Sequence, residues 1–462
     1  MRISDNVRSM WLAVFGKRLP KSLIDGDKMI SVWNDIYAGR PEWQKYTTRG
    51  IGGKRTEWRY LMNAGKIVCS EIAGLVFAEE PTMTVDDEVL KVLEENRFSS
   101  NAQGWLETSL ALGTGALKWV IKNGKPIIDW VKATDFVPVS YDARGITEAD
   151  FMSSEVFESK EYKVIEQHRK DGEGYKITLK VYENIGHDQY REVSPERAGI
   201  TETEWTSPVK LFEAWKNPET NNIDLYSPLG ISIFANAADT IQQLDKAFDY
   251  LAEELETSRR KIILPASMIS TYFDNTGKTK DLYYDKNERV YVAFNSDEVK
   301  DMTPVAIDFD LRIEKITATI NALLSVLSKQ CGMSDGFLSF DGASMKTATE
   351  VISENSKTFR TKKNLENSLG YTLVKFLSAL KSLDVVKTTD MEYSIEWDDS
   401  VIEDRNARAD YWNNRVSQGT ALLEDALMAM DGLAEDEAIL KAKAIRASRA
   451  TVDIGSMFGG QE

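Results

Sequence analysis

The chain has 462 residues, 42% hydrophobic and 28% charged, which is typical of globular proteins and long enough for about three domains. With 57 basic and 73 acidic residues, its formal net charge is −16, so it repels polyphosphate as a whole, and a conventional tight DNA-binding protein is disfavoured. Two distant cysteines and two histidines argue against a disulfide scaffold, a zinc ribbon and a histidine-based triad. No apolar stretch approaches the roughly 18 residues of a spanning helix, so we expect a soluble protein without a membrane partner.

The first part of the chain, up to about residue 115, is expected to be mostly helical. Apolar residues recur there at three- and four-residue spacing between positions 58 and 72. From Leu117 the apolar period changes to two, with an Asn-Gly turn at residues 123 and 124. We therefore predict that an antiparallel β unit of about six short strands follows the helices.

Two stretches with the same heptad spacing flank a non-helical insert, residues 262–309. The first lies in a helix predicted over residues 229–261 and the second in a helix predicted over residues 310–332. The insert contains strand-like runs, so we expect a small β tip at the end of a long helical hairpin. The seam residues are Ile241, Leu244, Phe248, Leu251 and Leu255 in the first helix and Ile313, Ile316, Ile320, Leu323 and Leu327 in the second.

A glycine-rich loop is predicted over residues 333–346, and it contains the apolar Phe337, Leu338 and Phe340. A capping-box pattern at Thr347 then begins a helix of about 37 residues. One strand and a helical C-terminal part, about residues 403–452, follow that helix.

The segment from residue 343 to residue 381 departs from the acidic balance of the chain, because it has seven bases and three acids. A solvated helix face explains such a run, and so does intermittent contact with phosphates in a channel. Both interpretations stay open at the sequence level. The candidates for phosphate contact are Lys346, Lys357, Arg360, Lys362 and Lys363.

An acidic cluster follows the last predicted strand. Asp398, Asp399, Glu403 and Asp404 either cap the next helix or hold a divalent cation such as Mg²⁺. A metal-dependent nucleic-acid enzyme that uses Asp398, Asp399 and Asp404 is therefore an alternative hypothesis for function. By contrast, the GKT at residues 277–279 lacks the spacing of a phosphate-binding loop, so we do not predict nucleotide binding there.

Several stretches resemble the portal proteins of tailed double-stranded DNA bacteriophages, siphophage type. The most specific are the NNID and SPLG stretches at residues 221–230 and KTATEV at residues 346–351. Three further stretches agree in order, so the resemblance spans nearly the whole chain. They are YKVIEQHRKDGEGYKITLKVYEN, IEWDDSVIED and VSQGTALLEDALMAMDGLAEDEAILKAKAI.

The resemblance implies a non-enzymatic virion protein of α+β, predominantly helical fold that needs no cofactor. It implies a ring, typically of twelve copies, at one capsid vertex, which forms a channel for double-stranded DNA during packaging and ejection. The implied partners are terminase, a head-tail adaptor, and the major capsid and scaffolding proteins, with host cytoplasm as the place of assembly. A capsid scaffold or adaptor without a channel is the other structural alternative.

The resemblance also divides the chain into named parts. These are a wing (1–228 with 347–402), a stem (229–261 and 310–332), a clip (262–309), a tunnel loop (333–346), a crown (403–452) and a flexible tail (453–462). It assigns partner docking to the clip, with Lys278, Lys280, Asp281 and Lys286 as candidates. It assigns contact with moving DNA to the tunnel loop, with Phe337, Leu338, Phe340, Asp341, Ser344 and Lys346 as candidates.

The seams and the loop agree with that assignment. The predicted hairpin is too elongated to hide both seams in one core, so we expect part of each to pack on neighbouring copies. The apolar loop residues either touch DNA without ionic attraction or are buried against a neighbouring subunit.

Overall fold

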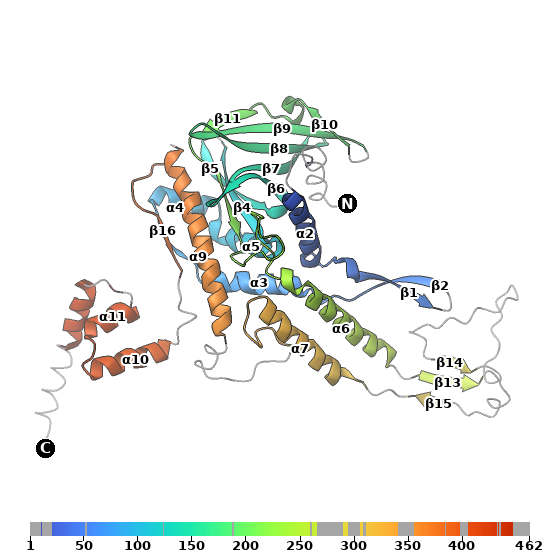
Figure 1. The fold of residues 1–462 in the computed structure, drawn as a ribbon. Helices are drawn as coiled ribbons and strands as arrows, with labels where there is room; N and C mark the ends of the chain where they lie inside the picture. Colours follow the sequence, from blue (N-terminus) through green and yellow to red (C-terminus); the bar gives the residue numbers. More distant parts are fainter. Residues whose placement is uncertain are drawn as a thin grey trace, which may run out of the picture. The chain divides into compact units, whose positions relative to one another are not determined.

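The computed structural model describes residue 11 and residues 21–50, 53–122, 124–186, 189–258, 261–265, 290–293, 305–307, 311–340, 355–383, 385–397, 405–431, 433 and 436–446. The chain divides into a larger unit, residues 1–343 with 360–397, and a smaller unit, residues 344–359 with 398–462. Helices and strands occur together in it, which confirms the α+β class (Figure 1). No helix among the described residues is both long enough and apolar enough to cross a membrane.

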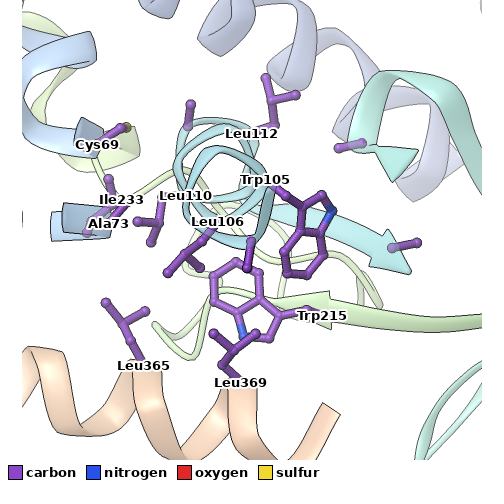
Figure 2. Close-up of a cluster of buried hydrophobic side chains, with 14 of the residues drawn as sticks. Cys69, Ala73, Trp105, Leu106, Leu110, Leu112, Trp215, Ile233, Leu365 and Leu369 are labelled. Carbon is purple, nitrogen blue, oxygen red and sulfur yellow. The ribbon is translucent and has the colours of Figure 1, made fainter. Parts of the chain in front are cut away.

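The core of the larger unit is built around a helix whose C-terminal half is buried on nearly every side. This helix is α5, Phe98–Leu112, and α2 (Lys21–Tyr37), α3 (Ala64–Val76) and α4 (Asp87–Glu95) pack on it. Figure 2 shows α5 between α3 and α9, a long helix described below, with the apolar side chains directed at one another. The labelled side chains include Leu106 and Leu110 of α5, Cys69 and Ala73 of α3, and Leu365 and Leu369 of α9.

A β-hairpin interrupts the region that the sequence predicted as mostly helical. Its strands are β1, Lys45–Gly50, and β2, Gly53–Trp58, paired antiparallel. The prediction is wrong here because the apolar spacing that indicated helix begins only at Trp58 and does not extend over residues 45–57, where the hairpin forms. Alternating Tyr, Thr and charged residues favour a strand in each arm.

The strands that follow form two sheets, where the sequence predicted one unit. A three-stranded sheet has the order β12, β4, β5, and a larger sheet has the order β10, β9, β8, β7, β6, with β11 pairing β9. The prediction of a single unit is wrong because β4 and β5 pair with β12, a strand almost a hundred residues after β4, and not with the strands that follow them directly. The bounds are β4 Thr114–Lys122, β5 Lys125–Lys132, β6 Phe136–Asp142, β7 Gly145–Phe157, β8 Lys160–Asp171, β9 Gly174–Gly186, β10 Gln189–Val193, β11 Glu204–Ser207 and β12 Phe212–Lys216.

The helical hairpin is present, and its first helix is shorter than the predicted range of residues 229–261. Helix α6 covers Ala238–Thr257, and helix α7 covers Ile313–Gln330. Residues 229–234 are non-helical because they pass through the core beside α5, where Ile233 N donates to Leu110 O. Between the helices the described residues form a three-stranded sheet, with β13 (Lys261–Pro265) paired parallel to β14 (Val290–Ala293) and antiparallel to β15 (Val305–Ile307).

Helix α9, Ser356–Ser378, crosses the core of the larger unit beside β4. Phe376 stacks on Trp119 with ring centroids 4.3 Å apart, and Trp119 Nε1 donates to Phe376 O at 2.9 Å. Strand β16, Ser394–Glu396, then pairs antiparallel with β3, Thr82–Thr84, so the predicted return strand is confirmed.

The smaller unit is helical over its described residues. It contains α10 (Arg405–Ser417), α11 (Leu423–Asp431) and a helical stretch over residues 436–446. Gly419, with φ of +68°, ends the helical run between α10 and α11. Arg446 Nη2 bonds Glu424 Oε2 at 2.7 Å and joins the last helical stretch to α11.

Candidate functional site

The candidate site is the helical hairpin, the loop after it and the basic face of α9. Both heptad seams are partly buried inside this single chain. Five of the ten seam residues are at most 6% exposed: Ile241, Leu244, Ile316, Ile320 and Leu327. Four more are half-buried (Phe248, Leu251, Ile313 and Leu323), and Leu255 is 53% exposed.

About half of the seam residues are therefore buried within their own chain, and the expected packing of the remainder on neighbouring copies stays a prediction. The halves of α6 and α7 nearest the core pack on each other, and α6 also packs on α3, because the hairpin begins inside the core. A neighbour could cover only the apolar surface that remains further along the hairpin. Among the described residues, that surface includes Tyr250 and Leu255, which are 41% and 53% exposed.

An ion pair fixes α6 and α7 at the end far from the core. Arg312 Nε and Nη2 donate to the two carboxylate oxygens of Glu254 at 3.1 and 2.7 Å, although Glu254 is only 4% exposed. These bonds from Arg312 hold the pKa of Glu254 below its ordinary value. A bidentate Arg–carboxylate pair has a defined geometry, so it sets the separation of the helices where the chain enters the β tip.

The turn after α7 is fixed to α9. Gly332 has φ of +75°, and Met333 N donates to Ser328 O at 2.8 Å, as in a Schellman helix end. Thr361 Oγ1 of α9 donates to Gly332 O at 2.6 Å. A Cβ at position 332 would lie 2.8 Å from that hydroxyl, so the contact requires glycine.

The loop that follows folds back along α7. Asp335 pairs with Lys329 at 2.8 Å and accepts a hydrogen bond from Ser325, and these contacts lower the pKa of Asp335. Further on, Phe340 N donates to Asn321 Oδ1 at 2.9 Å. The loop therefore retraces about two turns of the helix that it leaves.

The apolar loop residues divide into two groups. Phe337 and Leu338 are half-buried against the core of their own chain, which neither sequence interpretation included, and Phe340 is 46% exposed. The other candidates of this loop, Asp341, Ser344 and Lys346, lie outside the described residues.

The basic residues of α9 are not equivalent. Lys357 and Arg360 are exposed, whereas Lys362 is 2% exposed and bonds the buried Glu366 at 2.6 Å. Lys363 lies 3.8 Å from the same carboxylate. Lys362 cannot present its charge to a phosphate, so its assignment as a DNA contact is wrong. A helix periodicity of 3.6 could have placed it on the same face as Glu366 and Leu369.

The remaining sequence candidates lie outside the described residues. These are the clip residues Lys278, Lys280, Asp281 and Lys286 and the acidic residues Asp398, Asp399, Glu403 and Asp404. Within the part of the chain that the structure describes, no group of three His, Cys, Asp or Glu residues could hold a metal ion.

Sequence reasoning also missed a buried charge cluster that joins the two sheets. Lys118 of β4 bonds Glu166 of β8 at 2.7 Å and Asp129 of β5 at 3.3 Å, and His168 Nε2 lies 2.6 Å from Glu166. Burial alone would raise the pKa of Glu166, but Lys118 and His168 lower it to about 2. No sequence signal identifies the cluster, because its members come from three strands.

The order of these parts is the one expected for a portal protein of tailed phages: a mixed core, a helical hairpin with a β tip, a folded-back loop, a long helix and a helical C-terminal part. Residues 30–450 match the model of the family described as "Phage portal protein, SPP1 Gp6-like". The chain therefore belongs to this family of structural virion proteins, which are not enzymes. Membership confirms the resemblance found in the sequence and opposes the hypothesis of a metal-dependent enzyme.

Solved structures give weaker similarities. A chain from "Virion of native gene transfer agent (GTA) particle" is 12% identical, with a TM-score of 0.44 over 80% of this chain and 89% of that one. A chain from "Neck of native GTA particle computed with C12 symmetry" is also 12% identical, with a TM-score of 0.39 over 79% and 88%. No curated protein sequence matches the chain.

Proposed function

We propose that the chain assembles into a closed ring at one capsid vertex and forms the channel through which double-stranded DNA enters and leaves the particle. Twelve copies are proposed because that number is typical of the family. The family match over residues 30–450 carries the proposal. The arrangement of a stem hairpin, a β tip and a folded-back loop supports it.

In this proposal each part of the chain has one task. The hairpin of α6 and α7 is the stem that lines the channel, and the β tip between them is the clip that docks terminase and later the head-tail adaptor. The remainder of the larger unit is the wing, which contacts the capsid and scaffolding proteins. The helical C-terminal part is the crown. The ion pair of Glu254 and Arg312 supports a rigid stem, because it fixes the two helices where the clip begins.

The charges support a channel that lets DNA slide. Helix α6 has six acids and one base, so it adds no net attraction for phosphate. Every Lys–phosphate contact adds affinity, and a ring multiplies each contact by its number of copies. On the described part of α9, Lys357 and Arg360 remain as exposed candidates for intermittent contact. We propose that Lys363 and Lys346 add to them.

The tunnel loop is proposed to be a displaceable collar. Over its described part it is held to α7 by one ion pair and a few hydrogen bonds, and Phe340 is exposed. An exposed ion pair contributes little, so the part of the loop beyond Phe337 and Leu338, which pack on the core, can leave α7 at low cost. An apolar side chain can then touch DNA without binding it tightly.

Two experiments test the proposal. Negative-stain images of the purified chain should show rings with a central hole, and a strictly monomeric chain at every concentration contradicts it. Shortening residues 335–343 should lower the yield of DNA-filled particles while rings still form. An unchanged yield would remove the loop from the mechanism.

A further inference from the structure

The β1–β2 hairpin is hydrogen-bonded to α6 at its base, and beyond the base its two strands pair only with each other among the described residues. Trp43 Nε1 and Met62 N both donate to Asp245 of α6, at 2.9 and 3.0 Å, and Tyr60 N donates to Asp249 at 3.0 Å. Beyond these residues, β1 and β2 form a sheet of only two strands among the described residues (Figure 1). An isolated two-stranded ribbon is only marginally stable in water, so this one is suited to packing on a partner.

The outward surface of the hairpin is cationic and aromatic. Lys45, Lys54 and Arg55 are exposed, and Lys45 Nζ lies 5.6 Å from the ring of Trp58, which is 63% exposed. Tyr60, at the base, is 57% exposed. Exposed Trp, Tyr and Arg side chains are the residues most often found at the centres of protein interfaces.

Glu57 is the single acidic residue in the two strands, and its carboxylate does not neutralise the exposed basic residues of the hairpin. Glu57 accepts hydrogen bonds from Tyr46 Oη at 3.1 Å and Thr48 Oγ1 at 3.0 Å. Residues 40–60 contain six bases and two acids, a net charge of +4. The rest of the chain then has 51 bases and 71 acids, a net charge of −20. Copies of this chain therefore repel one another unless a basic element of one meets an acidic element of the next.

Helix α4 is an acidic surface on another side of the larger unit. Residues 79–96 contain seven acids and one base, and Leu90 is 37% exposed there. Glu80, Asp87, Glu88, Glu94 and Glu95 are all exposed. Figure 1 places α4 and the hairpin on opposite sides of the larger unit. On α6, by contrast, Asp245 and Asp249 bind the hairpin base of their own chain, and Glu254 binds Arg312.

We propose that the β1–β2 hairpin of one copy docks on the acidic face of α4 of the next copy. The hairpin and the α4 face lie on opposite sides of one chain, so the contact between copies is head-to-tail. Such a contact closes into a ring when the rotation from one copy to the next allows it. This proposal rests on the proposed ring and names the surfaces that would hold neighbouring copies together.

A second copy fits this hairpin better than duplex DNA does. An exposed indole and phenol gain most from burial in a protein pocket, whereas contact with a duplex backbone offers them none. Lysines along the strands also oppose the addition of a further strand, so the contact uses the face of the ribbon and not its edges. Duplex DNA as the occupant would overturn the proposal.

Charge reversal in the full-length chain tests the contact. Lys54→Glu with Arg55→Glu should raise the concentration needed for half-assembly by about tenfold or more, measured by sedimentation velocity, because like charges would then face each other. Adding Glu94→Lys and Glu95→Lys should restore assembly. These lysines would lie in the last turn of α4, where cations favour a helix. The matched control is Lys160→Glu with Lys170→Glu, which changes net charge equally on β8 and should leave assembly unchanged.

The outcomes separate this contact from the ring itself. A wild-type chain that never forms rings would defeat the proposed function first. Rings that are unaffected by Lys54→Glu with Arg55→Glu, or a defect that the α4 reversals do not restore, would overturn the hairpin contact and leave the ring standing. Loss of binding to a fluorescent 30-base-pair duplex by that variant, with assembly intact, would make nucleic acid the occupant and overturn the contact as well.

Trp58→Ala, which keeps every charge, should weaken assembly without lowering the melting temperature.

Discussion

The buried charge cluster between the two sheets gives the sharpest prediction for stability. Glu166→Gln keeps the size of the side chain and removes the charge that faces Lys118 Nζ at 2.7 Å. The side chain of Lys118 is only 6% exposed, so its ammonium group would lose its closest counter-charge without gaining water. Asp129, at 3.3 Å, would remain as a second and more exposed partner.

Two estimates of the cost agree. Removing one partner of a buried ion pair costs about 3–5 kcal/mol, and the surviving Asp129 places this variant near the lower end. The pKa of Glu166 falls from an ordinary 4.5 to about 2 in the folded chain. A shift of that size corresponds to about 3 kcal/mol of stability at neutral pH. We therefore expect Glu166→Gln to lower the free energy of unfolding by about 3 kcal/mol.

The pH dependence follows from the direction of the shift. A carboxylate with a lowered folded-state pKa contributes its full stability above its unfolded pKa, near 4.5, and loses it as the pH falls towards about 2. The difference in stability between wild type and Glu166→Gln should be largest at neutral pH and should shrink below pH 4.5.

Urea unfolding followed by near-ultraviolet circular dichroism at several pH values measures both effects. Lys118→Met with Glu166→Leu is the matched control, because replacing both partners by apolar groups of similar size leaves no buried charge unpaired, and it should recover most of the loss. The reasoning is refuted if Glu166→Gln stays within about 1 kcal/mol of wild type and has the same pH dependence.

Three further predictions concern the core and α9. Gly113→Ala should lower the melting temperature clearly, because φ is +80° there and a Cβ would lie 2.5 Å from the carbonyl carbon of Ile231; an unchanged melting curve would show that the backbone adapts. Phe376→Ala should cost about 3–5 kcal/mol and speed hydrogen exchange in α9, because the ring is 1% exposed and stacked on an indole; exchange at the wild-type rate argues against this. Arg360→Glu should lower the yield of DNA-filled particles without changing the melting temperature, because Arg360 is exposed. Lys362→Met should lower the melting temperature instead, because it leaves the buried carboxylate of Glu366 unpaired. The opposite pattern would mean that Lys362, and not Arg360, contacts DNA.

The sequence predicted those elements whose signal lies within one stretch of chain. The heptad spacing from Ile241 and from Ile313 located α6 and α7, and period-two patterns located most strands, although not their grouping into two sheets. The helix end at Gly113, followed at once by β4, was also readable from local residues. The hairpin at residues 45–58 was missed, although its glycines flanked by Tyr and Thr residues are a hairpin signal.

The candidate site was predictable as a set of segments but not as a set of exposed groups. The sequence placed Lys362 with Lys357 and Arg360, yet packing buries only Lys362 and pairs it with Glu366. It placed Phe337, Leu338 and Phe340 together in one glycine-rich loop, yet two of them pack on the core. The family assignment survived these errors because it rested on the order of motifs and not on exposure.

For this protein the sequence alone determined most of the succession of helices, strands and turns, because periodicity and turn residues act over a few neighbouring positions. The portal family was identified separately, from the resemblance of particular sequence stretches that agree in order. Only the tertiary structure decided which faces are covered. Strand β12 meets β4 across almost a hundred residues, and half of the stem seam is buried in its own chain. Burial and charge pairing depend on which distant surfaces meet, and local patterns do not encode that choice.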